Sequence, residues 1–164
     1  MPKVIRNMIA DYLNTAEKGP TETWSLMGAG FTSLDENPSA KVDSTAYISD
    51  ASASGTITGY KNTFAFDTQF ISDEAAIKKI YEIARNQKVG SDAECDYLRV
   101  DLWDTPTTET KYPARKFRVA VEVTGITGAG TEVVRVAGNL HQVGDFVPGK
   151  FNTSTKTFTA DGEE

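Results

Sequence analysis

The sequence predicts a mainly β domain with a single α-helix packed against one face of its sheet. Several segments alternate apolar and polar residues with a period of two, which is typical of half-buried strands. One segment, 73–87, instead has the 3.6-residue period of an amphipathic helix, and one such helix covers one apolar face of a sheet. The chain has 164 residues, enough for one domain with its own core.

Residues 1–20 are expected to form an N-terminal arm outside the core. The apolar residues in this segment have near-helical spacing, so a short amphipathic helix is one reading of it. These residues are Val4, Ile5, Met8, Ile9, Tyr12 and Leu13. The main β domain is then expected over 21–160, and the end of the chain, 161–164, should fray.

The segment 36–62 is rich in Ser, Ala, Thr, Asp and Gly and has few apolar residues. A structureless loop of this length is unusual inside a compact domain. We therefore expect either a projecting hairpin or a segment that a partner orders. A clear strand pattern follows, with Phe64, Phe66 and Phe70 on one face.

The helix predicted over 73–87 has Ser72 as a candidate N-cap, and its apolar stripe has the expected i, i+3, i+4, i+7 spacing. The stripe consists of Ile77, Ile80, Tyr81 and Ala84. A strand is expected next, over about 94–103, with Leu98 and Val100 on one face and Arg99 and Asp101 on the other.

The segment 114–145 predicts one long β-hairpin with an apolar and a charged face. The apolar face carries Phe117, Val119, Val121, Val123, Val134, Val136 and Leu140, and the charged face carries Arg118, Glu122, Arg135, Asn139 and His141. One more short strand is expected within 146–160.

No catalytic, cofactor or metal site is expected. The net charge of −6 argues against a protein that binds nucleic acid by phosphate neutralisation and against adhesion to anionic membranes. The only histidine, His141, has no nucleophile nearby in sequence, and the acidic neighbours of Cys95 disfavour a thiolate. No secretory signal or membrane-spanning run is evident.

Four segments, taken in order, resemble the major tail tube proteins of long-tailed bacteriophages of the siphovirus type. They are WSLMGAGFTSLDENPSAKVDSTAYI, FAFDTQFISDEAAIKKIYEIARNQKVGSDAECDYLRVDLW, ARKFRVAVEVTGITGAGTEVVRVAGNLHQVGD and GKFNTSTKTFTA. The resemblance implies a β-sandwich or rolled β-barrel with a flanking helix. It also implies hexameric rings that stack into a hollow tail tube, through which genomic DNA passes into the host without sequence-specific binding.

The same resemblance implies partners and a location. The partners are further copies of the chain, a tape measure protein, tail terminator and tip proteins, and a sheath if the tail is contractile. The location is the virion tail, assembled in the host cytoplasm, and no membrane is involved.

Two sets of residues are then expected to act in assembly. The lumen of the tube would be lined by Arg118, Glu122, Arg135, Asn139, Arg99 and Asp101. Contacts between rings would come from Lys41, Asp43, Tyr47, Ile48, Ile57 and Tyr60. The competing reading is a monomeric β-sandwich module that binds carbohydrate or peptide through Trp24, Trp103 or Tyr60, with an enzyme as a distant third.

Overall fold

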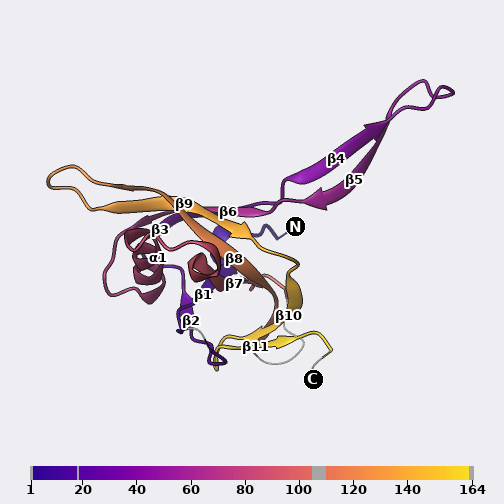
Figure 1. Ribbon diagram of the computed structural model, residues 1–164. Coiled ribbons are helices and arrows are strands. Elements are labelled where there is room, and N and C mark those ends of the chain that lie inside the picture. Colours follow the sequence, from indigo (N-terminus) through magenta and orange to yellow (C-terminus); the bar gives the residue numbers. More distant parts are fainter. Residues whose placement is uncertain (1, 18, 105–109, 163–164) are drawn as a thin grey trace.

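A strongly curved antiparallel sheet forms the body of the computed structural model, which describes residues 2–17, 19–104 and 110–162 (Figure 1). Seven of its strands run in the order β2-β1-β7-β8-β9-β6-β3, and β10 and β11 join beside β8. Their bounds are β1 (Ile9–Asn14), β2 (Trp24–Leu26), β3 (Phe31–Asn37), β6 (Thr63–Gln69), β7 (Glu94–Asp101), β8 (Lys111–Thr127), β9 (Arg135–Gln142), β10 (Val147–Asn152) and β11 (Thr157–Ala160). The mainly β fold with one α-helix is confirmed.

Strand β8 is the centre of the sheet because it pairs with three other strands. One edge pairs with β7. The other edge pairs with β10 over 111–116 and with β9 over 119–127. The sheet therefore divides into two wings on that side of β8, one made of β9, β6 and β3 and the other of β10 and β11.

The larger core lies between the sheet and helix α1 (Ala75–Arg85). The helix buries Ala76, Ile77, Ile80 and Ile83. They face an aromatic centre in which the rings of Phe64 and Tyr97 lie 4.7 Å apart and those of Phe64 and Phe117 lie 4.9 Å apart. The helix begins two residues later than expected. Glu74 is its N-cap residue and makes no side-chain capping bond, so the prediction of Ser72 as the cap is wrong.

A smaller core lies on the opposite face of the sheet. It contains Tyr12, Trp24, Leu98, Val100, Ala114 and Phe151. Because both faces of β7 are covered, its residues 97–100 are all buried, the charged Arg99 included. A strand buried on both faces loses the outward polar face that alternation predicts.

The N-terminal segment corrects the sequence-based expectation. Residues Ile9–Asn14 form β1, an interior strand between β2 and β7, and Leu13 is completely buried. Residues 9–14 are therefore neither a helix nor an arm outside the core, whereas residues 2–8 are exposed and include one short 3-10 turn at Arg6–Met8. The apolar spacing fits a strand as well as a helix at this length, and pairing with two neighbours decides the outcome.

Strands β4 (Ala40–Thr45) and β5 (Ser54–Tyr60) form a separate two-stranded sheet that projects from the body (Figure 1). We call residues 40–60 the arm. At the other end of the chain, Asp161 and Gly162 form a turn, whereas Glu163 and Glu164 lie outside the described residues, so the expectation of fraying is not tested.

Candidate assembly surfaces

The arm is joined to the body by two short connections. Pro38 and Ser39 lead from β3 into β4, and Lys61 and Asn62 lead from β5 into β6. The backbone of Lys61 donates a hydrogen bond to the carbonyl of Ser39, 3.2 Å away, which ties the two connections together. An isolated two-stranded hairpin is marginally stable in water, so the arm depends on this base or on a partner for its order.

The arm has an apolar face and a polar face, and a β-bulge creates the separation. Lys41 pairs with Gly59, but the next residue, Val42, pairs with Ile57, so Thr58 is the extra residue of the bulge. Without it, Ile57 and Tyr60 would point to opposite faces, because side chains alternate along a strand. With it, Val42, Ile57 and Tyr60 share one face, and Lys41, Asp43 and Thr56 share the other.

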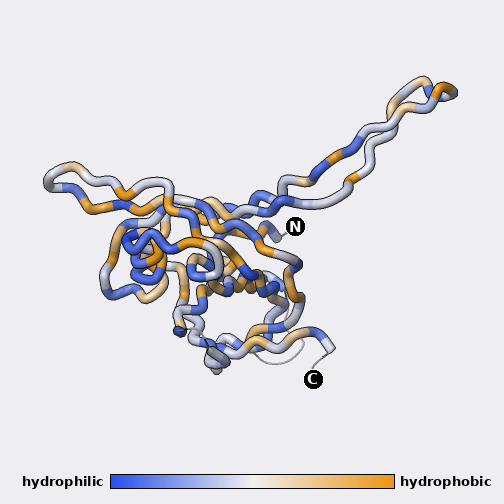
Figure 2. The backbone as a smooth tube through the Cα atoms, viewed as in Figure 1, coloured by the Kyte–Doolittle hydropathy of each residue, from blue (hydrophilic) through white to orange (hydrophobic). Residues whose placement is uncertain are grey.

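Large apolar side chains of the arm are exposed. The exposed fractions are 58% for Val42, 56% for Ile57 and 67% for Tyr60, and Ile48 at the tip is fully exposed. Figure 2 shows apolar segments along the arm although it extends away from the body. All six residues expected to contact a neighbouring ring lie on the arm or its tip, but they do not form one surface. Lys41 and Asp43 face away from Ile57 and Tyr60.

Four of the six residues expected in the lumen share the outward face of the β8–β9 hairpin. They are Arg118, Glu122, Arg135 and Asn139. The alternate residues point into the core, where Val119, Val136 and Leu140 are completely buried. Glu122 and Asn139 are direct cross-strand partners, so the pairing of β8 with β9 brings them together.

The cations on this face each lie beside an acid. Arg118 lies 3.3 Å from Asp96, and Arg135 lies 3.1 Å from Asp67. Glu122 accepts a 2.9 Å hydrogen bond from Asn139 and lies 3.3 Å from Nε2 of His141. The hydrogen bonds from Asn139 and His141 lower the pKa of Glu122. The result is a polar, locally balanced face without a strong field of either sign.

Arg99 and Asp101 do not belong to this face, which corrects the sequence-based set. Along β7 they share the side of Tyr97, opposite the side on which Asp96 meets Arg118. Arg99 is 6% exposed, so it cannot line an open surface. Asp101 is half-buried at the end of β7, and burial raises its pKa.

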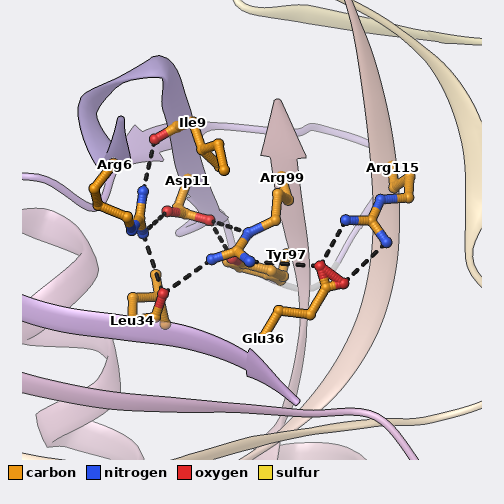
Figure 3. Close-up of polar contacts among 8 residues, drawn as sticks. All are labelled: Arg6, Ile9, Asp11, Leu34, Glu36, Tyr97, Arg99 and Arg115. Carbon is orange, nitrogen blue, oxygen red and sulfur yellow. Dashed lines mark hydrogen bonds and ion pairs between the residues drawn. The ribbon is translucent and has the colours of Figure 1, made fainter. Parts of the chain in front are cut away.

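Arg99 belongs to a buried polar cluster that closes the curved sheet between β1 and β3 (Figure 3). Its Nε donates to Asp11 Oδ1 at 2.9 Å, and its Nη2 donates to the carbonyl of Leu34 at 3.0 Å. Asp11 also accepts hydrogen bonds from the Tyr97 hydroxyl and, at 2.6 Å, from Arg6. Burial by itself would lower the pKa of Arg99, but Tyr97 and Asp11 raise it overall, so the guanidinium stays charged.

The same cluster reaches the base of the arm through Glu36. This residue lies near the end of β3 and accepts two hydrogen bonds from Arg115, at 3.0 and 2.7 Å, in a bidentate pair. Burial by itself would raise the pKa of Glu36, but the hydrogen bonds and charge of Arg115, with Arg99, lower it overall. We call the contact of Glu36 with Arg115 and Arg99 the arm clamp. In the sequence, Arg115 falls in the long predicted hairpin and Glu36 begins the segment 36–62, and neither pattern reveals that these two side chains meet.

Two of the residue types considered above for chemistry or ligand binding, cysteine and the aromatic residues, can be placed in the structure. Cys95 is buried, and burial raises the pKa of its thiol to about 12, which makes it a poor nucleophile. The part of the chain that the structure describes contains no group of three His, Cys, Asp or Glu placed to hold a metal ion. Trp24 is buried in the smaller core and Tyr60 is on the arm, so these two aromatic residues do not build a shared binding surface.

No helix within the described residues is long and apolar enough to cross a membrane. No family model matches the sequence, and no curated protein matches it.

Comparison with solved structures finds one that shares the fold. It is described as the tail of an empty GTA particle computed with helical refinement and C6 symmetry. It aligns with a TM-score of 0.59 at 9% identity, over 96% of this chain and 100% of that one. Another, from the anti-feeding prophage (AFP) baseplate, aligns with a TM-score of 0.49 at 6% identity, over 90% and 95% of the two chains. This chain therefore has a fold found in a tail assembly.

Proposed function

We propose that this chain is a structural protein that forms rings, that the rings are hexameric, and that they stack into the hollow tail tube of a bacteriophage. The observation that carries the proposal is the near-complete overlap with the GTA tail subunit, which extends over 96% of this chain. The tail of the empty GTA particle has C6 symmetry, which is the basis for six subunits in each ring. The tube would give genomic DNA a passage into the host.

The outward face of the β8–β9 hairpin is our candidate for the wall of the passage. Arg118 and Arg135 lie beside acids, and Glu122 is hydrogen-bonded to Asn139. A face without excess positive charge would not hold DNA by releasing its counterions, so DNA could slide past it. Arg99 and Asp101 are no longer part of this proposal because they lie on the other side of β7.

The arm is our candidate for the contact between successive rings. It extends from the body and carries apolar side chains that are more than half exposed. Head-to-tail contacts of this kind propagate along an axis when a projecting element of one copy meets a different surface of the next. The tape measure protein, the terminator and tip proteins, and a sheath in a contractile tail would be the other partners, in the virion tail after assembly in the host cytoplasm.

Size-exclusion chromatography and negative-stain microscopy of the purified chain test the proposal. Rings or tubes with a central channel are expected. A compact monomer at every concentration would overturn it and favour the binding-module alternative.

Deletion of Lys41–Gly59 tests whether the arm is needed for the rings to stack into a tube. The core residues all lie outside this segment, so the shortened chain should remain folded, as judged by circular dichroism and thermal melting. It should form no tubes. Tubes of normal length from the shortened chain would show that the arm is not the contact between rings.

A further inference from the structure

The arm presents two chemically different faces, and only one of them is suited to burial. Val42 and Ile57 are cross-strand partners on the apolar face, and Tyr60 lies on the same side because of the bulge at Thr58. On the polar face the corresponding positions are Lys41, Asp43 and Thr56. A sheet with one apolar face is stable only when that face packs against something.

Within the described residues, the body of the same chain leaves most of the apolar face exposed. Val42, Ile57 and Tyr60 are each more than half exposed. By contrast, Phe64 and Leu140 are completely buried in the larger core of the body. Both connections at the base of the arm are two residues long and are tied together, and the arm clamp holds the end of β3. These contacts fix the base of the arm in its projecting orientation (Figure 1).

The size of the face indicates what kind of partner can cover it. Strands of six or seven residues, rising about 3.3 Å per residue and spaced about 4.8 Å apart, give a face on the order of 200 Å². A stable interface between two proteins buries about 800 Å² on each partner. One arm is therefore too small to hold a separate protein tightly, whereas many identical arms presented together bind strongly by avidity.

We propose that the arm binds a second copy of this chain through its apolar face alone, with Val42, Ile57 and Tyr60 buried in the contact and the polar face left in water. The inference rests on the proposed function and makes it more specific. It separates four of the six arm residues expected from the sequence into two groups. Ile57 and Tyr60 contact the neighbouring copy, and Lys41 and Asp43 face solvent.

Ile57→Asp and Thr56→Asp form a matched pair for testing the proposal. The two residues are adjacent in sequence and lie on opposite faces, so each variant adds the same charge at the same point of the arm. Ile57→Asp should raise the minimum concentration for self-association at least tenfold, measured by analytical ultracentrifugation and negative-stain microscopy. Thr56→Asp should leave it within about twofold of the wild-type value.

Val42→Asp provides a second variant on the apolar face and should repeat the effect of Ile57→Asp. None of the three residues belongs to either core, so all variants should melt at the wild-type temperature. Equal loss of association in Ile57→Asp and Thr56→Asp, or no loss in either, would overturn the one-sided contact.

The outcome also separates this inference from the tube proposal. If the wild-type chain assembles into tubes and the Ile57→Asp and Thr56→Asp variants do the same, only the one-sided contact fails. If the wild-type chain forms small oligomers without tubes, and Ile57→Asp and Val42→Asp abolish them while Thr56→Asp does not, the contact stands and the tube proposal fails. A wild-type chain that never self-associates overturns both.

Discussion

The two long hairpins of this protein have the same binary pattern but different surroundings. In β8–β9 the apolar face rests on the body, so Val119, Val136 and Leu140 are completely buried and the polar face is left outside. In the arm the apolar face is largely exposed, and Ile57 is 56% exposed. The comparison teaches that an amphipathic pattern indicates only that the apolar face must be buried, not what buries it. Whether the cover comes from the same chain depends on where the hairpin is attached.

The first prediction contrasts one glycine from each hairpin. Gly138 of β9 lies so close to the bulged part of β8 that an added Cβ would be 1.9 Å from the carbonyl oxygen of Glu122, whereas nothing lies within 4 Å of a Cβ added at Gly59 of the arm. Gly138→Ala should cost about 3 to 5 kcal/mol of unfolding free energy, because backbone must shift in the centre of the sheet. Gly59→Ala should change it by less than about 0.5 kcal/mol.

Urea unfolding of the two glycine variants measures this difference, with circular dichroism to confirm that each folds. If Gly138→Ala prevents folding altogether, the prediction is met in its extreme form. A cost below about 1 kcal/mol at Gly138 would contradict the view that the bulge brings the two strands into close backbone contact.

The second prediction concerns the arm clamp, where the two regions of the molecule are joined. The pKa of Glu36 is lower in the folded protein than its ordinary value of 4.5. Its ionised form therefore stabilises the fold at pH values above about 4.5, and this contribution is lost as the pH falls through the lower, folded-state value. Glu36→Gln should cost about 1 to 2 kcal/mol at pH 7 and progressively less as the pH falls below 4.5.

Unfolding of Glu36→Gln and wild type at several pH values between 3 and 7 tests the clamp. Glu132→Gln, at an exposed position in the turn between β8 and β9, removes one carboxylate without touching the clamp and serves as the control. A constant difference between Glu36→Gln and wild type across this range would contradict the assignment, because it would show that ionisation of Glu36 does not contribute.

The sequence predicts each hairpin better than it predicts how the strands meet. The period-two pattern of 114–145 and the helical pattern around Ile77 and Ile80 are local, and the structure has a hairpin and a helix there. β1 is mistaken for an arm because its spacing fits two structures and only its pairing with β2 and β7 decides between them. Arg99 is assigned to an open surface because alternation cannot reveal that β7 is covered on both faces.

The surfaces of the arm show the same limit. The sequence indicates that 36–62 projects or awaits a partner, but a strict period of two places Ile57 and Tyr60 on opposite faces. Only the bulge at Thr58 brings them together, and bulges leave no reliable mark in a single sequence. The polar composition of the arm is visible in the sequence, whereas its apolar face can be identified only from the register of β4 with β5.

The last prediction returns to the outward face of β8–β9. The pKa of Glu122, like that of Glu36, is lowered in the folded protein, in this case by hydrogen bonds from Asn139 and His141. The side chain of Glu122 is 50% exposed, however, and that of His141 is 38% exposed, so solvent screens the interaction. Glu122→Gln should therefore change the unfolding free energy by less than about 0.5 kcal/mol at pH 7, as measured by urea unfolding beside Glu36→Gln. A loss above about 1 kcal/mol would show that the fold needs this face. A near-neutral result would mean that the stability of the fold does not depend on the charge of Glu122. The charged residues of this face would then be free to serve the proposed wall of the passage.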